Sequence, residues 1–145
     1  MTATLDLWPI GNCQVSALVD RAGRLVWGCV PRVDGDPAFS ALLTDADLDD
    51  PGETQGFWSI TLEGSEAVEQ DYRRNTPVLV SRHSDVAGNA IEVIDFCPRF
   101  RRHGRAYRPV AFVRIVRPLQ GSPRVRIRLR PARGKIGRAS CRERV

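Results

Sequence analysis

Short runs of alternating apolar and polar residues, separated by turn-forming residues, recur along most of this chain. A period of two residues is typical of strands that bury one face. The pattern predicts seven strands, over Ser16–Asp20, Arg24–Gly28, Gly56–Leu62, Pro77–Arg82, Ala90–Phe96, Ala111–Val116 and Arg124–Arg130. Their number and spacing favour an all-β fold, an antiparallel β-sandwich.

Two of these segments stand out by their patterning. In Ala90–Phe96 the apolar positions change phase, which predicts either a bulge or a strand buried on both faces. Arg124–Arg130 alternates without a break, with four arginines on one face and three aliphatic residues on the other. It is expected to be an edge strand with one wet face, where charge blocks further pairing. A face that docks on an acidic domain, or on nucleic acid, is the alternative.

The segments between the strands predict one helix and several turns. Asp36 is placed to cap a short helix, Pro37 suits its first turn, and residues 38–43 continue it. The acidic stretch over residues 44–54 is expected to be a solvated loop. Gly23 is expected to supply a positive φ in the hairpin turn at residues 21–23.

The end of the chain differs in composition from the rest. Lys135 is the only lysine, and the ten residues after it resemble a translated sequencing adapter. We therefore expect residues 135–145 to be a foreign tail and residues 1–134 to form one domain, the truncated front of a longer protein. The tail holds four basic residues and one acidic residue, so removing it lowers the formal net charge from +5 to +2. The case for a polyanionic partner weakens accordingly.

Outside the tail, the three cysteines are Cys13, Cys29 and Cys97. Their spacing fits neither a disulfide framework nor a zinc site, and it predicts buried thiols in a reducing compartment. The first residues lack a signal-peptide pattern, and no run approaches the ~20 apolar residues of a membrane span. We therefore expect a cytoplasmic protein with no membrane partner. His83 and His103 have no metal-ligand spacing and are expected to be exposed, and no cofactor or metal is expected.

The sequence holds no recognisable active-site motif. Phosphate-binding glycine loops, nucleophile elbows and metalloprotease helices are all missing from it. Two carboxylate pairs, Asp34 with Asp36 and Glu92 with Asp95, have the residue type that glycosidases use. Turn or surface roles are the expected ones for these four residues. We predict no catalytic residue in this chain.

Two binding functions stay open at this point. Trp8, Trp27 and Trp58 would make a sugar platform in a stand-alone carbohydrate-binding module, if they are exposed and coplanar. Residues 99–108 contain five arginines, two aromatic residues and a histidine. Proteins use this mixture on single-stranded nucleic acid, where charge meets phosphate and rings stack on bases. A polar hairpin loop between two strands is the alternative for the same segment.

An ordered motif covers residues 10–34, and three further blocks follow it at Tyr72–Leu79, Val93–Arg99 and Val113–Val116, with Leu129-Arg-Pro131 after them. Together they resemble the start of bacterial and archaeal glycoside hydrolase family 15 proteins, the glucoamylase-like and trehalase-like enzymes with a trehalase-like N-terminal domain. The chain departs from that pattern at Ala22, Val26, Val33 and Gly35. The matching positions before the later blocks are Ile10, Gly11, Asn12, Ala17, Leu18, Val19, Arg21, Gly23, Trp27, Cys29, Pro31, Arg32, Asp34 and Phe39.

This resemblance implies a β-sandwich domain that precedes an (α/α)6 barrel. The barrel of such an enzyme hydrolyses α-glucosidic bonds, as in trehalose or maltooligosaccharides, with inversion by two glutamates. Those glutamates belong to barrel segments outside this sequence, so the chain alone is expected to be inactive. It would support the barrel, shape the entrance to the active site and contribute to oligomer contacts. No cofactor is implied.

The resemblance also suggests where the barrel would meet this domain. Trp27, Arg32, Asp34 and Phe39 are our candidates for a surface that faces the barrel or lines the substrate entrance. Arg32 and Asp34 could make charge-assisted hydrogen bonds across such an interface. Alternatively, they pair with neighbours inside the sandwich.

Overall fold

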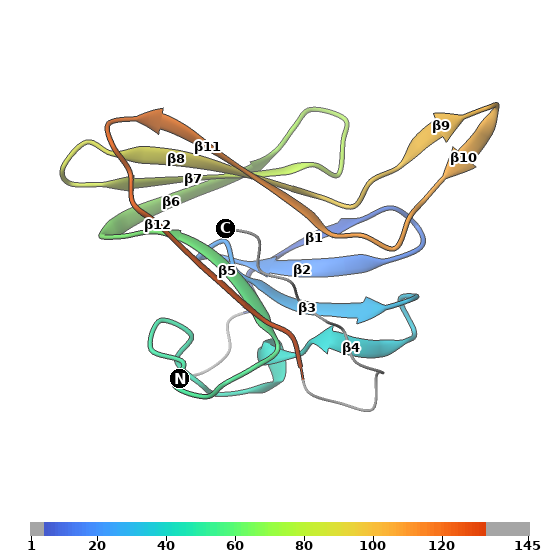
Figure 1. Cartoon of the computed structure of the whole chain (residues 1–145), viewed down its shortest axis with the longest axis horizontal. Coiled ribbons are helices and arrows are strands. Elements are labelled where there is room, and N and C mark those ends of the chain that lie inside the picture. Colours follow the sequence, from blue (N-terminus) through green and yellow to red (C-terminus); the bar gives the residue numbers. More distant parts are fainter. Residues whose placement is uncertain (1–4, 133–145) are drawn as a thin grey trace.

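The computed structural model describes residues 5–132, and it shows the all-β antiparallel fold that the alternation predicts. The tail expected over residues 135–145 lies outside the described residues. One sheet, called the first sheet here, has the strand order β1-β2-β3-β5-β12, and β4 also pairs with β3 (Figure 1). Its strands are β1 (Leu7–Gly11), β2 (Ser16–Asp20), β3 (Leu25–Val30), β4 (Asp36–Phe39), β5 (Phe57–Leu62) and β12 (Val125–Arg130).

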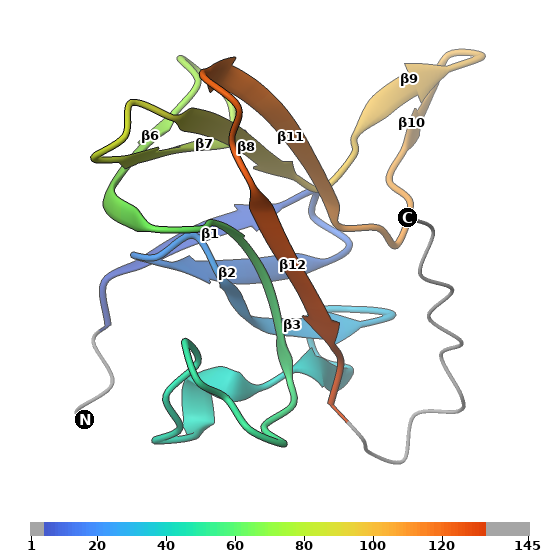
Figure 2. The same cartoon turned by 60° about the vertical axis from the view of Figure 1, so that its left-hand side comes forward.

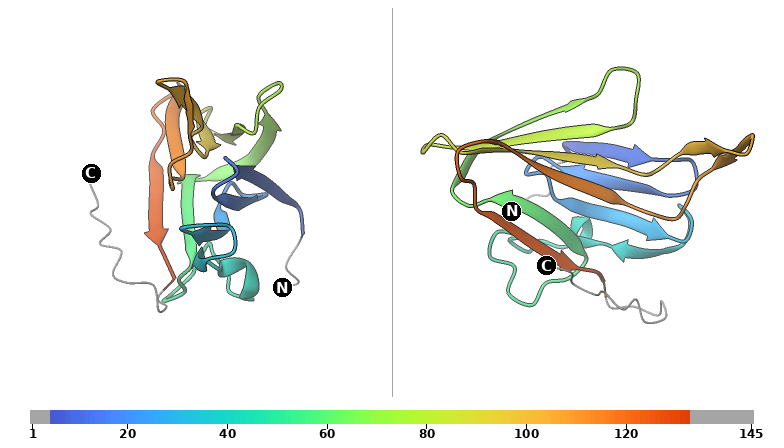
Figure 3. Two further views of the ribbon diagram at one scale, coloured as in Figure 1. Left: turned by 90° about the vertical axis from the view of Figure 1, so that its right-hand side faces the viewer. Right: turned by 45° about the horizontal axis from the view of Figure 1, so that its top comes forward.

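The second sheet has the order β11-β8-β7-β6 and lies over the first (Figures 1 and 2). A small hairpin of two further strands projects from one end of the molecule, clear of both sheets (Figure 3). We call it the basic hairpin and define it as residues 99–108. The strands of the second sheet and of the hairpin are β6 (Ser65–Tyr72), β7 (Leu79–Asp85), β8 (Ala90–Phe96), β9 (Phe100–Arg102), β10 (Arg105–Tyr107) and β11 (Val113–Gln120).

The main core fills the space between the two sheets. Leu25 of β3 and Leu79 of β7 share one buried cluster, and Ile60 of β5 and Ile91 of β8 share another. Each cluster therefore joins the first sheet to the second. This is the packing that makes a sandwich, in which both sheets bury their inner faces.

A second, smaller core lies on the other side of the first sheet. Phe57 and Val26 are buried there beneath Ala41 and Leu48. Leu48 belongs to the acidic stretch, so this loop is not fully solvated as expected. It folds back and covers an apolar patch that one sheet face would otherwise expose to water.

The helix expected over residues 36–43 does not form. Asp36–Phe39 is strand β4, which pairs with β3, and only a single 3-10 turn follows it at Ala41–Leu43. A short helix gains little from its own hydrogen bonds, whereas strand pairing buries Phe39 in the main core. Pro37 fits the observed structure because β4 is an edge strand, where a missing backbone N–H costs nothing.

The structure explains why the apolar positions of β8 change phase along the strand. Ile91 and Val93 face the main core, and Ile94 is buried on the opposite face of the sheet. Burial of both faces, one of the two expected explanations, is therefore confirmed. The core-facing position that follows Val93 is Asp95, which is fully buried beside Arg114 of β11. A polar residue occupies an inner position, and this is what breaks the pattern.

Candidate docking surface

The four residues proposed from the resemblance do not share one surface. Arg32 and Asp34 lie in the turn between β3 and β4 and form a two-point ion pair, with Nε–Oδ1 3.0 Å and NH2–Oδ2 2.9 Å. Both side chains are about two-thirds exposed, at 66% and 65%. Phe39 is buried in the main core, where its ring meets Phe112. Trp27 is half-buried in β3. Of the four, Arg32 and Asp34 are exposed, Trp27 is partly exposed and Phe39 is buried.

That ion pair belongs to an end of the sandwich where several loops meet, at the right of Figure 1. The turns after β1, β3 and β6 and the segment that leads into β9 surround an open pocket of about 970 Å3. Its lining is mostly apolar, and half-exposed Phe100 and exposed Val33 lie at its rim. We call this pocket the apolar groove. It is lined by Pro9, Ile10, Gly11, Asn12, Cys13, Val15, Ser16, Val33, Thr76, Pro77, Val78, Phe96, Cys97, Pro98, Arg99 and Phe100.

One buried side chain fixes the basic hairpin beside this groove. Asn12 donates from Nδ2 to the carbonyl oxygens of Pro98 and Pro109, each at 2.9 Å. Its Oδ1 accepts from the backbone N–H groups of Gln14 and Val15 at 2.9 and 3.0 Å. All the amide's main hydrogen-bonding positions are therefore used. Because Pro98 and Pro109 flank the hairpin, Asn12 ties both of its legs to the β1–β2 turn.

Residues 99–108 form a hairpin between β8 and β11, as the expectation of a polar hairpin loop between two strands has it. His103 and Gly104 make its turn with φ values of 49° and 73°, the pair of positive angles that a tight two-residue hairpin needs. Register places Phe100 opposite Tyr107 and Arg102 opposite Arg105. The two rings meet edge to face, with centroids 5.1 Å apart. One face therefore carries an aromatic pair near the body and an arginine pair near the tip.

The hairpin's positive charge has no counterpart among the residues that the structure describes. None of its five arginines forms an ion pair with any residue in the described range 5–132. Arg99 only approaches the Cys13 thiol, at 3.5 Å. Arg102 and Arg105 are like charges directly opposite on paired strands, an arrangement that is unfavourable by itself.

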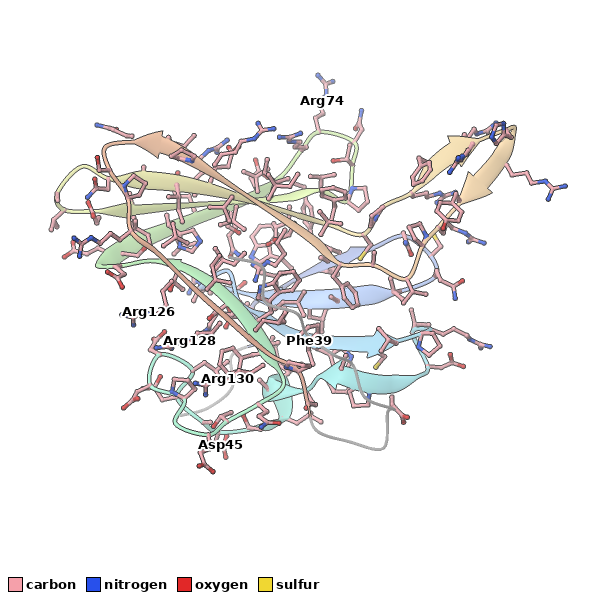
Figure 4. All side chains as sticks on the ribbon, in the orientation of Figure 1. Phe39, Asp45, Arg74, Arg126, Arg128 and Arg130 are labelled. Carbon is pink, nitrogen blue, oxygen red and sulfur yellow. The ribbon has the colours of Figure 1, made fainter. Side chains whose placement is uncertain are left out.

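Strand β12 uses its arginines in a different way. Arg126 pairs with Glu63 at 3.1 Å, and Arg128 donates to the Asp49 carbonyl oxygen at 3.1 Å. Arg130, labelled with Arg126 and Arg128 in Figure 4, comes from the same strand. It donates to the carbonyls of Gly52 and Thr54, and its guanidinium lies over the Phe57 ring. The arginine face thus rests on the acidic loop instead of facing only water.

The aliphatic face of β12 is partly open. Within the described residues β12 pairs only with β5, so its expected position at a sheet edge is confirmed. Its inward-facing Ile127 is nevertheless 59% exposed, and Leu129 is exposed as well. The second sheet ends at β11 and does not reach over these two side chains.

A polar cluster lies inside the sandwich, where sequence reasoning expected none. Arg114 and Asp95, both with fully buried side chains, form a two-point ion pair at 2.7 and 3.0 Å. Arg114 also donates to the carbonyls of Trp58 and Gly23, and its guanidinium lies 5.5 Å from the Trp58 ring centre. Each of the three guanidinium nitrogens of Arg114 therefore donates to an acceptor, as a buried charge requires.

His83 belongs to the same buried cluster, so the expectation that it is exposed is wrong. Its residue is only 1% exposed, and neither ring nitrogen has a hydrogen-bond partner among the described residues. Burial, and then the nearby Arg114 charge, lower the pKa of His83 from 6.5 to about 4. Gly23 lies against the ring: a Cβ there would be 3.0 Å from Nε2, and its φ of 75° confirms the predicted turn.

The carboxylate pairs do not form a catalytic site. Asp95 faces the core, whereas Glu92 faces outward and pairs with Arg82 at 3.4 Å. Successive odd and even positions of β8 point to opposite faces, so these two carboxylates are separated by the sheet. Asp34 is occupied by Arg32. Among residues 5–132 no three His, Cys, Asp or Glu side chains gather as a metal ion would need.

The cysteines and tryptophans also differ from simple expectations. Cys29 and Cys97 are buried free thiols, and burial raises the pKa of both, that of Cys97 to about 12. Cys13 is exposed, contrary to the expectation, because it lies in the β1–β2 turn.

Trp8, Trp27 and Trp58 are all half-buried, and the Trp8 ring packs against the Tyr72 ring with centroids 5.3 Å apart. They do not form an exposed coplanar platform.

The architecture defines the class of protein as an antiparallel β-sandwich with a projecting basic hairpin. Comparison of the chain with protein-family models, with curated proteins and with solved structures finds no match. Across the part of the chain that the structure describes, no helix has the length and apolar character to span a membrane.

Proposed function

We propose that this chain is the non-catalytic N-terminal β-sandwich domain of an enzyme of the glucoamylase and trehalase type, which hydrolyses α-glucosidic bonds. The observation that carries the proposal is the use of the motif residues. Asn12 anchors the hairpin, Gly23 makes room for His83, and Asp95 holds the buried Arg114. The residues that carry the resemblance build and orient a sandwich, which is what a supporting domain needs.

In this proposal the α-glucoside reaches a separate catalytic barrel, and the sandwich supplies no reacting group. The described carboxylates support this division of labour, because the candidate pairs are either split across a sheet or bound to arginine. We place the enzyme in the cytoplasm as part of the same proposal. The free thiols of Cys13, Cys29 and Cys97 suit a reducing compartment.

The first test is long-read sequencing of the source locus across the codon for Gly134, followed by expression of whatever open frame it reveals. We expect a frame that continues into a helical barrel, and a full-length product that hydrolyses trehalose or maltose. The 145-residue chain should show no turnover of either sugar. A frame that stops at the present end, or robust hydrolysis by the short chain, would refute the proposal.

The two rival binding functions find less support in the geometry. A carbohydrate-binding module needs an exposed aromatic platform, and the three tryptophans are half-buried, with Trp8 and Trp58 packed against the main core. A nucleic-acid protein would use both arginine groups together. Those groups lie far apart, and the arginines of β12 are engaged with Glu63 and the acidic loop (Figure 4).

A further inference from the structure

We propose that the basic hairpin and the apolar groove together bind an extended segment of a partner protein. In this segment a carboxylate follows two residues after an apolar side chain. This inference stands independently of the proposed function. It starts from unbalanced charge: from Phe96 to Ala132 the chain has eleven arginines and no aspartate or glutamate. Arg114 and the arginines of β12 find acceptors inside the molecule, and the five arginines of the hairpin find no carboxylate among the described residues.

The hairpin's geometry sets the order of chemical groups in the ligand. The Phe100–Tyr107 pair lies beside the groove, and the Arg102–Arg105 pair lies two residues further toward the tip on the same face. Two residues of a strand span about 7 Å. An extended peptide that places an apolar side chain at the groove would therefore place a carboxylate at the arginine pair two residues later.

A carboxylate at that point would also relieve the repulsion between Arg102 and Arg105. Charge-assisted hydrogen bonds from a guanidinium to a carboxylate are strong and directional. The hairpin is held for this task before any ligand arrives, since Asn12 fixes both of its legs. Preorganisation of this kind lowers the entropic cost of binding.

A protein segment fits these features better than nucleic acid does. The neighbouring groove is lined mostly by apolar groups, which a sugar-phosphate backbone would not fill. The Phe100 and Tyr107 rings contact each other edge to face at an interplanar angle of 65°, so they do not present two parallel faces to successive stacked bases. Apolar contact with a charged rim is the usual pattern of a protein interface.

The test uses the whole 145-residue chain and fluorescein-labelled peptides in fluorescence anisotropy. The probe has phenylalanine or leucine followed two residues later by glutamate or aspartate, repeated twice. Its matched control has glutamine and asparagine at the acidic positions, and a labelled oligothymidylate tests nucleic acid. We expect binding of the acidic peptide that weakens as salt rises and is lost with the amide peptide.

Three variants make the result specific. Arg102→Ser/Arg105→Ser should weaken binding by at least about tenfold, and Phe100→Ser should weaken it through the apolar contact. Arg117→Ser/Arg124→Ser removes exposed charge at the far end of the sandwich and should leave affinity unchanged. Equal loss in this control, absence of peptide binding, or tighter binding of the oligothymidylate would each overturn the proposal.

Discussion

Strand β12 and the basic hairpin are both rich in arginine, and the fold uses them in opposite ways. Both are short and free of acidic residues. The arginines of β12 meet Glu63 and the carbonyls of the acidic loop, and the guanidinium of Arg130 lies over the Phe57 ring. The arginines of the hairpin meet no carboxylate or carbonyl acceptor among residues 5–132. The difference teaches that an arginine-rich pattern has no fixed meaning until its surroundings are known.

Arg114 is the extreme case of a matched arginine, and breaking its pair should have the largest effect. In Asp95→Leu the guanidinium stays buried without its counter-ion, which costs about 3–5 kcal/mol of unfolding free energy. Urea unfolding followed by tryptophan fluorescence measures the loss. Glu92→Gln on the outer face of the same strand is the control and should change stability by less than about 1 kcal/mol. A loss below that level in Asp95→Leu would show that Arg114 is not held by this pair.

His83, beside Arg114, should make stability depend on pH. The unfolded chain takes up a proton near pH 6.5, but the folded chain resists it until about pH 4 because its pKa is lowered. Stability is therefore complete above pH 6.5 and falls by up to about 3 kcal/mol as the pH drops from 6.5 to 4. Urea midpoints measured across this range should show a shallower slope in His83→Gln. An unchanged slope would mean that other groups cause the acid sensitivity.

Removing one arginine from β12 and one from the basic hairpin tests the contrast between these two regions most directly. Arg130→Ser removes hydrogen bonds to the acidic loop and the cover over Phe57, so we expect a loss of about 1–2 kcal/mol. The loop should also become more open, which hydrogen exchange at Gly52 to Gly56 would detect. If Arg130→Ser is neutral, the acidic loop does not depend on β12 for its position.

The smallest expected effect is that of Arg102→Ser in the hairpin. Since Arg102 faces Arg105 and pairs with no carboxylate in the described range, its removal should raise stability by a few tenths of a kcal/mol at low salt. The gain should fade at high salt, where the repulsion is screened. A clear loss of stability would reveal an internal role for Arg102 and would erase the difference between the two regions.

The alternation of apolar and polar residues predicts the strands that bury one face. It fails for strands whose burial does not follow such an alternation. β2, β5 and β8 match their expected segments closely. β6 was not expected, because it is an edge strand with few apolar residues and shows little period. The sequence predicts a helix where β4 forms, because the local signals of Asp36 and Pro37 are the same for a helix start and for an edge strand.

The polar features of the site were harder to predict than the strands. Asp95 is expected in a turn or on the surface, which is wrong, because its partner Arg114 lies on another strand and carries no local signal. Burial of His83 depends on Gly23, sixty residues earlier, leaving room for the ring. Asn12 lies within the motif, yet its hold on Pro98 and Pro109 links positions far apart in the sequence. Pairings of this kind come from tertiary structure alone.

The hydrogen bonds from Asn12 to Pro98 and Pro109 also affect which sequence changes this domain can accept during evolution. They close residues 98–109 into a side branch whose two ends are held together by one amide group. Substitutions or length changes inside the branch leave the path of the flanking strands untouched, because exposed loop tips tolerate insertion well. The sandwich can therefore exchange one recognition element for another at this branch, while its core stays the same.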